Sequence, residues 1–155
     1  LGMAWVASKF PRFGMLIAQK EWAKLDHLFF KTLINSMSAV ITGSLLLFIA
    51  VYGLNAIEHP LVNRLVSLTT LATLLGATIF LHIVYCNYFY LRAHKKEPLL
   101  TLNIIFSLTN GLLVWFLGSH YAALGASLAY LLSEGLILFP FSTIIFFRCR
   151  EKWHK

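Results

Sequence analysis

One carboxylate near the middle of a long apolar run is the residue whose chemistry stands out in this sequence. Glu134 lies in residues 121–147, which contain no Lys or Arg, and shares a helical face with Ser127 and Tyr130. An ionised carboxylate facing lipid at that depth would cost several kcal/mol, so Glu134 must face protein or a water-filled cavity, or stay protonated. Two roles remain open for it: ion coupling or solute passage, and a hydrogen bond to a neighbouring helix.

Polar residues at helical spacing also mark the other apolar runs. Asn103, Ser107 and Asn110 recur at i, i+4 and i+7. Such a stripe either lines a hydrophilic passage or bonds one helix to another. The number of these stripes, together with the mid-membrane carboxylate, favours a cavity. The candidates for substrate passage are Glu134, Asn103, Asn110, Ser127 and Tyr130.

The helix that carries Glu134 also contains two residues that weaken it. Gly135 has a low helix propensity, and Pro140 removes a backbone hydrogen bond to the carbonyl of Leu136. Transporters often place an interrupted helix beside an ion or substrate site. We therefore expect a hinge at Gly135 and Pro140.

The sequence shows no constellation typical of an enzyme. It has no Ser/His/Asp set, no paired carboxylates, no clustered metal ligands and no Gly-rich phosphate loop. Cys86 and Cys149 are expected to be unpaired thiols, and the lone His82 to be a packing residue rather than a proton relay. We therefore expect no catalysis, no metal and no cofactor.

The elements that position these residues are four apolar runs, residues 32–54, 65–91, 99–117 and 121–147. Each is long enough for a helix that crosses a bilayer, which needs about 20 residues. A hydrophobic fraction of 59% and a charged fraction of 12% exclude an ordinary water-soluble domain, in which about 25% of residues are charged. The sequence predicts an all-α polytopic membrane protein with four transmembrane helices.

The basic residues predict how these helices are oriented. All but one of the 13 Lys and Arg residues fall before, between or after the two pairs of runs, and Arg64 is the exception. By the positive-inside bias, the N-terminal segment, residues 92–98 and the basic tail 148–155 are cytoplasmic, whereas residues 55–64 and 118–120 face out. The spans then form two antiparallel hairpins. Tyr85 and Tyr88 are expected at the inner membrane boundary. The net charge of +7 is attributed to attraction to anionic lipid headgroups and not to nucleic acid.

Residues 9–31 are predicted to form a cytoplasmic amphipathic connector, with one helix from Met15 to Lys31 that continues into the first span. This helix would lie at the inner headgroup boundary or pack on a neighbouring cytoplasmic loop. The apolar stripe consists of Ala18, Trp22, Leu25 and Phe29, and the opposite basic stripe of Lys20, Lys24, His27 and Lys31. Because the chain opens on Leu1 and residues 1–7 resemble the end of an earlier span, we expect a fragment that forms one membrane domain, residues 1–155.

Two passages carry a family resemblance. The first is Phe10-Pro11-Arg12, followed by the connector through Lys24-Leu25-Asp26 into a span. The second is the segment YAALGASLAY at residues 121–130, which is similar to the pattern Tyr-Gly-x-x-Gly-Ala-x-x-Ala that opens the last helix of a six-helix half. In these passages the chain resembles the C-terminal part of a polysaccharide flippase of the O-antigen type, in the multidrug/oligosaccharidyl-lipid/polysaccharide flippase superfamily.

The resemblance implies a fold and a function. Members usually have twelve helices in two six-helix bundles around a central cavity, so the four spans would be the last four helices and the missing N-terminal bundle would be a partner. Cationic residues for the lipid pyrophosphate are absent from these spans and would lie in the missing part. The implied function is translocation of a polyprenyl-diphosphate-linked oligosaccharide across the bacterial inner membrane by alternating access. The alternatives are a multidrug/cation antiporter of the same superfamily and a non-transporting four-helix scaffold subunit of a membrane complex.

Overall fold

The computed structural model describes residues 2–154, apart from the side chain of Asn63, and every regular element within them is a helix. The prediction of an all-α protein is confirmed. In chain order the elements are α1 (Gly2–Ala18), α2 (Trp22–Ala56), the short 3-10 helix η1 (Pro60–Arg64), α3 (Leu68–Ala93), α4 (Leu100–Ser133), the π-helical turn η2 (Glu134–Leu138) and α5 (Phe139–Trp153).

Three helical segments are long and apolar enough to cross a membrane: α2, α3 and the continuous segment from Leu100 to Trp153. The apolar runs become helices because a helix satisfies its backbone polar groups internally, which lipid requires. α3 begins after Ser67, whose hydroxyl accepts the Thr70 N–H at 3.2 Å and caps the helix. The predicted runs 32–54 and 65–91 therefore lie largely within α2 and α3.

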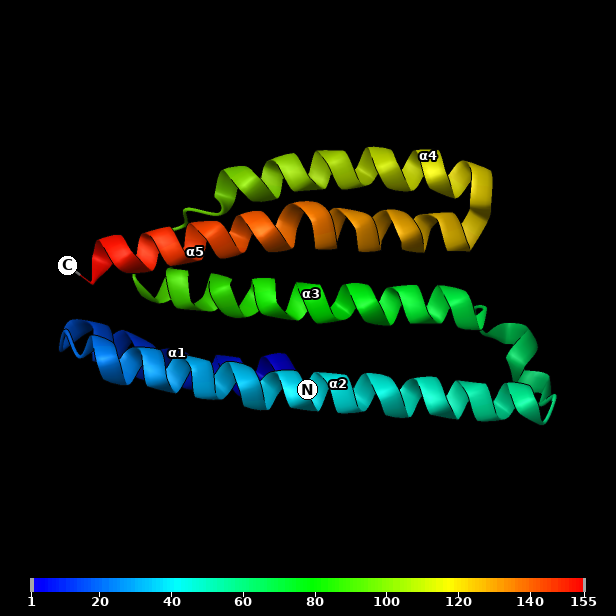
Figure 1. Cartoon of the computed structure of the whole chain (residues 1–155), viewed down its shortest axis with the longest axis horizontal. Coiled ribbons are helices and arrows are strands. Elements are labelled where there is room, and N and C mark those ends of the chain that lie inside the picture. Colours follow the sequence, from blue (N-terminus) through cyan, green and yellow to red (C-terminus); the bar gives the residue numbers. More distant parts are fainter. Residues whose placement is uncertain (1, 155) are drawn as a thin grey trace.

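The third apolar segment turns back on itself at Ala122. This residue has φ 50° and ψ −133°, and from there the chain runs back alongside the part of α4 that precedes it (Figure 1). The reversal is so tight that a Cβ at Gly125 would overlap the carbonyl of Leu117. The predicted turn at residues 118–120 is wrong in position, because the helix continues through Gly118, Ser119 and His120 before the chain reverses.

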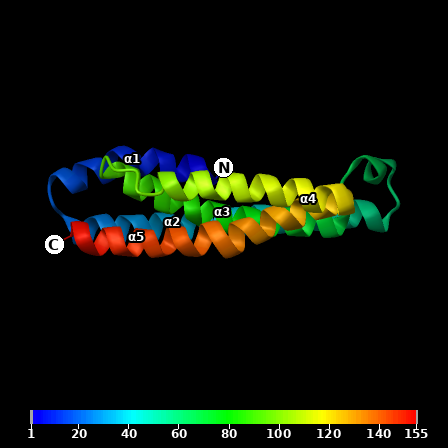
Figure 2. The same cartoon turned by 90° about the horizontal axis from the view of Figure 1, so that it is seen from above.

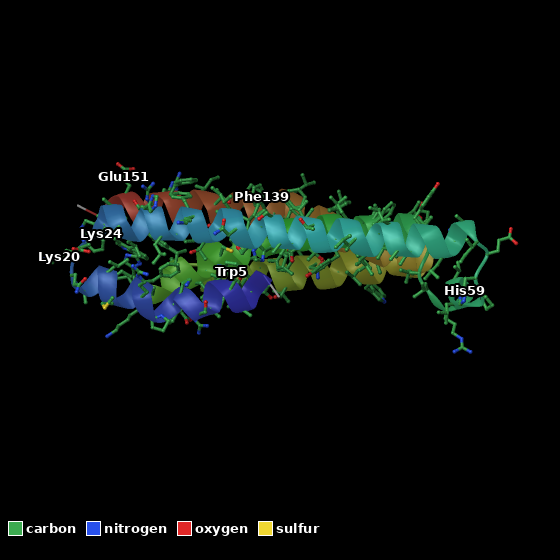
Figure 3. The ribbon with its side chains drawn as sticks, turned by 90° about the horizontal axis from the view of Figure 1, so that it is seen from below. Trp5, Lys20, Lys24, His59, Phe139 and Glu151 are labelled. Atoms are coloured by element: carbon green, nitrogen blue, oxygen red, sulfur yellow. The ribbon has the colours of Figure 1, made fainter. Side chains whose placement is uncertain are left out.

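The connections gather at the two ends of an elongated molecule (Figures 1 and 2). The turn between α1 and α2, the connection between α3 and α4 and the end of α5 lie together at what we call the basic end. The connection between α2 and α3 and the reversal at Ala122 lie at the opposite end. Lys20 and Lys24 mark the basic end and His59 the opposite end (Figure 3).

The predicted amphipathic helix from Met15 to Lys31 is wrong, because two helices meet there at a sharp turn. Lys20 takes φ 56°, a left-handed conformation that stops α1. The Lys20 N–H bonds to the Ile17 carbonyl at 3.1 Å and the Glu21 N–H to the Leu16 carbonyl at 3.0 Å, the pattern of a Schellman helix end. Ala18 therefore lies on α1, whereas Trp22, Leu25 and Phe29 lie on α2.

The buried hydrophobic core lies toward the basic end. α1 packs against both α2 and α3, and Gly2 is so close to them that a Cβ there would meet Val40 and His82 at 2.6 and 3.0 Å. Phe13, Phe29 and Tyr90 are fully buried in this core. The core holds α1, α2, α3 and α5 together, and of these helices α3 also lines the site described below.

Candidate functional site

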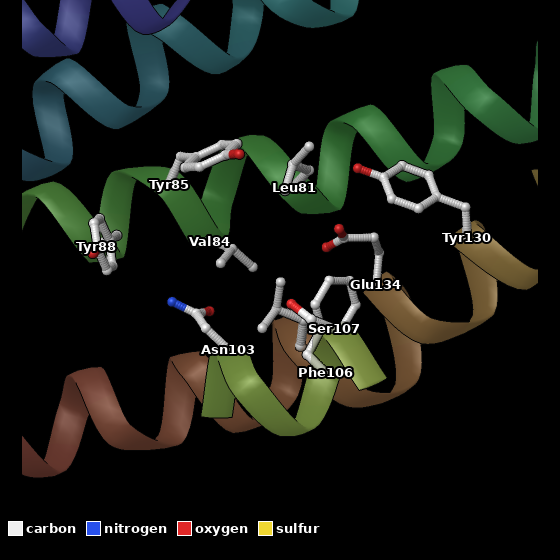
Figure 4. A pocket seen from close by; sticks show the side chains of 10 residues that line it. Leu81, Val84, Tyr85, Tyr88, Asn103, Phe106, Ser107, Tyr130 and Glu134 are labelled. Atoms are coloured by element: carbon white, nitrogen blue, oxygen red, sulfur yellow. The ribbon is translucent and has the colours of Figure 1, made fainter. Parts of the chain in front are cut away.

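A cavity of about 330 Å³ lies between α3, α4 and the π-helical turn η2 (Figure 4). Its wall combines hydroxyl, amide and carboxyl groups with aromatic and aliphatic side chains, so it can contact both polar and apolar parts of a ligand. The lining side chains are Leu81, Val84, Tyr85 and Tyr88 from α3, Asn103, Phe106, Ser107 and Tyr130 from α4, and Glu134 and Leu138 from η2.

Glu134 lies at the first position of the π-helical turn and points into this cavity (Figure 4). Only 1% of the residue is exposed, and its Oε2 atom has no hydrogen-bond partner within the described part of the chain. The Tyr130 hydroxyl, one helical turn earlier, interacts with the carboxyl. A buried carboxyl oxygen without a partner is costly, and a ligand, an ion or a proton would offset that cost.

The structure brings together three of the five residues predicted to line a passage. Asn103, Tyr130 and Glu134 all line the cavity. Asn110 lies outside it, where its Oδ1 accepts the Ser133 hydroxyl at 2.6 Å.

Ser127 also lies outside the cavity. Its hydroxyl accepts that of Thr73 at 2.7 Å and so links α4 to α3. Asn110 and Ser127 hold helices together in this structure, and in neither case does the side chain contribute to the cavity wall.

Two tyrosines of the cavity were not among the predicted site residues. Tyr85 and Tyr88 follow Leu81 at i+4 and i+7, so they present one face of α3 to the cavity. We expected both at the membrane boundary, where aromatic side chains are common. Their spacing was the available signal, but only the packing of α3 against α4 shows that this face borders Glu134.

The expected irregularity in the helix takes the form of a π-helical turn. The Phe139 N–H bonds to the Glu134 carbonyl, five residues back, and Pro140 lies in the first turn of α5. Pro140 has no N–H and cannot bond to the Leu136 carbonyl as a residue of a regular α-helix would. The wider π-helical turn before it accommodates this missing hydrogen bond. Gly135 lies against the ring of Phe80, which a Cβ would meet at 3.4 Å. Movement of Gly135 and Pro140 as a hinge stays a prediction.

His82 is part of a buried hydrogen-bonded group outside the cavity. Its Nε2 atom lies 2.9 Å from the Ser36 hydroxyl and 3.6 Å from the Cys86 sulfur. The group joins α2 to α3 close to Gly2 of α1. This arrangement supports the packing role expected for His82.

A second polar cluster, which was not predicted from the sequence, joins three helices at the basic end. Asp26 of α2 accepts the Tyr90 hydroxyl at 2.8 Å, and Arg150 of α5 donates to it from Nε and from Nη2, at 2.9 and 2.6 Å. The Tyr90 hydroxyl also lies 2.9 Å from His154 Nε2. The available signal was that Asp26 is the only aspartate in the chain and lies beside the basic stripe.

Aromatic rings cover this cluster. Trp22 stacks on His154 at 4.7 Å between ring centroids, and His94 lies 4.8 Å from Trp153. Burial lowers the pKa of His154; Asp26 opposes this effect and Arg150 adds to it. Burial also lowers the pKa of His94. Both imidazoles are therefore held in the neutral form to lower pH than usual.

Comparison with known proteins finds no family model, no curated protein and no solved structure that matches this chain.

Proposed function

We propose that the chain crosses a membrane four times, with α2, α3, the part of α4 before Ala122 and the segment from Ala122 to Trp153 as the spans. The support is the reversal at Ala122, which divides the third apolar segment into two antiparallel arms. The basic end faces the cytoplasm of a bacterial cell, because the loops with the most Lys and Arg gather there. The membrane is then the inner membrane.

The function that the site supports best is translocation of a polyprenyl-diphosphate-linked oligosaccharide, as in polysaccharide export. The observation that carries this proposal is the half-open cavity beside Glu134, where polar groups line a space between apolar helices and a buried carboxyl oxygen lacks a partner among the described residues. Sugars present many hydroxyl groups, and Asn103, Ser107 and Tyr130 can each bond to them. The second bundle implied by the family resemblance would complete the path.

Two other functions have specific support. A cation antiporter of the same superfamily would use Glu134 as its coupling group. A non-transporting scaffold subunit would use its polar residues to hold helices together, as the Ser133 to Asn110 and Thr73 to Ser127 bonds do.

Transport measurements with one variant separate the three. Inner-membrane vesicles that contain the intact protein are assayed with a labelled lipid-linked oligosaccharide and with a cationic dye, for the parent and for Glu134→Gln at equal membrane levels. The matched control is Glu58→Gln, which removes an exposed carboxylate near the opposite end. Flippase function predicts at least a tenfold loss of oligosaccharide transport in Glu134→Gln only. Loss of dye transport alone would favour the antiporter, and no transport of either compound by the parent would favour the scaffold.

A further inference from the structure

A groove with basic walls runs between α1 and α2 at the basic end, well away from the Glu134 cavity. It has a volume of about 460 Å³ and is lined by Arg12 from α1 and by Lys24, His27 and Lys31 from α2. Its remaining wall is apolar, formed by Leu16, Ala23 and Leu28. Four nitrogen-bearing side chains from two helices thus converge on one space.

The charges of this groove are only partly compensated by the protein itself. Lys24 Nζ lies 2.8 Å from Glu21 Oε1, so this lysine has a carboxylate partner. Within residues 2–154, no ion pair joins Arg12 or Lys31 to a carboxylate. Asp26 is engaged by Arg150 and Tyr90 on another side of α2. The groove therefore keeps a positive potential that suits an anion.

The groove continues along α2 toward the proposed membrane interior. A second hollow of about 360 Å³ shares His27 and Lys31 with the first and extends over Phe30, Ile34 and Asn35. Ile34 is 66% exposed and forms part of an apolar surface on α2. A ligand that follows both hollows needs a charged group at one end and a hydrocarbon chain at the other.

We propose that this groove is a binding site for an anionic phospholipid of the cytoplasmic leaflet. The phosphate lies among Arg12, His27 and Lys31, and one acyl chain lies over Phe30 and Ile34. Arg12 supplies a guanidinium fork that matches phosphate oxygens, and Lys31 adds a point charge where the polar part meets the apolar part. The site does not depend on the translocation proposed above, since it shares no residue with the Glu134 cavity.

The hydrocarbon-lined part of the groove favours a lipid over free phosphate. Inorganic phosphate would use the basic walls alone and would not contact Ile34 or Phe30. A zwitterionic lipid has the same phosphate and acyl chains, but its own cation offsets the attraction. The expected ligand therefore has both a net negative charge and an attached acyl chain.

The test measures lipid binding to the full chain in detergent micelles by native mass spectrometry. The probes are dioleoyl phosphatidylglycerol, dioleoyl phosphatidylcholine and inorganic phosphate. The variant is Arg12→Gln with Lys31→Gln, and the matched control is Arg148→Gln with Lys152→Gln, which removes the same charge from the basic tail. We expect the first pair to weaken phosphatidylglycerol binding at least about tenfold and the control about twofold or less.

A second variant tests the acyl part of the site without changing charge. Ile34→Asn is expected to weaken phosphatidylglycerol binding severalfold, whereas Ile49→Asn, at another exposed isoleucine of α2, is not. Helical circular dichroism equal to that of the parent shows that each variant is folded. Equal losses in the two charge pairs, phosphatidylcholine binding as strong as phosphatidylglycerol binding, or displacement of the lipid by millimolar phosphate would each overturn the proposal.

Discussion

At the scale of single residues, Asp26 bonds three helices together at the basic end. It is the meeting point of α2, α3 and α5, because its two oxygens are bonded by Tyr90 and by Arg150. The Asp26 side chain is 16% exposed and that of Arg150 32% exposed, so both ions have lost much of their hydration. A partly buried carboxylate of this kind is stabilised only while its donors stay in place.

Asp26→Asn is therefore expected to destabilise the protein. The substitution removes the charge that Arg150 faces and weakens the bond from Tyr90, and hydrogen bonds to charged groups contribute about 1.5–3 kcal/mol each. The measurement is the midpoint of thermal unfolding in detergent. Glu97→Gln is the control, because its ion pair with Arg92 joins side chains that are 44% and 50% exposed and contributes little. A smaller shift in Asp26→Asn than in Glu97→Gln would contradict the role given to Asp26.

The lowered pKa of His154 makes stability depend on pH in a defined direction. Burial favours the neutral imidazole in the folded chain, whereas an unfolded histidine titrates near pH 6.5. The unfolded state thus takes up a proton first as the pH falls. Stability is full above about pH 6.5 and decreases as the pH falls through the folded pKa.

His154→Gln tests this dependence, with unfolding measured between pH 7.5 and 5.5. We expect the variant to lose less stability over this interval than the parent. His120→Gln, at an exposed position near the opposite end, is expected to follow the parent. A parent protein that is more stable at pH 5.5 than at pH 7.5 would be inconsistent with a buried neutral His154.

At the scale of elements, the reversal at Ala122 leaves little space for a larger side chain. Gly125 lies directly against the Leu117 carbonyl, and a methyl group has no space there. Gly125→Ala is expected to destabilise the fold by about 1–3 kcal/mol, the usual range for overpacking.

Gly111 provides the comparison on the same helix. No atom lies within 4 Å of a Cβ built at Gly111, so Gly111→Ala is expected to be neutral or slightly stabilising, since alanine favours helix. Thermal unfolding of both variants checks the pair of expectations. If Gly111→Ala lowered the unfolding temperature more than Gly125→Ala, the backbone at Gly125 would not be as close to the Leu117 carbonyl as described.

The sequence predicted the helices well, but it predicted the turns less well. Long apolar runs favour helices in an apolar solvent, so the runs 32–54 and 65–91 fall largely within α2 and α3. The start of α2 was predicted poorly, because this helix begins at Trp22 and not at Met15. The stop after α1 was missed because Lys20 takes a left-handed conformation without a Gly, Asn or Pro to mark it. The reversal at Ala122 was misplaced because Gly118 and Ser119 are typical turn residues, yet the helix continues through them and through His120.

The site was predicted in part for a related reason. Periodicity places Tyr130 and Glu134 on one face, because both lie on the same stretch of helix. It cannot show which face of a neighbouring helix they meet, so Tyr85 and Tyr88 were assigned to the membrane boundary. Periodicity also cannot distinguish a polar side chain that faces a cavity from one that bonds to another helical segment. Asn110 is of the second kind, because it bonds to Ser133 on the other side of the reversal.

At the scale of the whole molecule, packing is uneven along its length. The buried core lies toward the basic end, where α1 is in contact with α2 and α3. Toward the opposite end, large side chains of α2 and α4 such as Leu46, Ile49, Leu112 and Trp115 are exposed. An exposed apolar surface of this kind is favourable in contact with lipid or with other apolar helices, and unfavourable in contact with water.

The proposed translocation requires water in the Glu134 cavity, the half-open space between α3, α4 and η2. Ser107 and Leu108 are neighbouring exposed residues of α4, but only Ser107 lines the cavity, and Leu108 is 67% exposed outside it. The decisive measurement replaces Cys86 and Cys149 by Ser, introduces Ser107→Cys or Leu108→Cys, and follows labelling in sealed vesicles by a charged thiol reagent that reacts only in water. We predict that Ser107→Cys is labelled at least tenfold faster than Leu108→Cys and that Glu134→Gln changes its rate. Equal, slow labelling of both positions would mean that water does not reach Glu134, and the account of the cavity as a translocation site would be wrong.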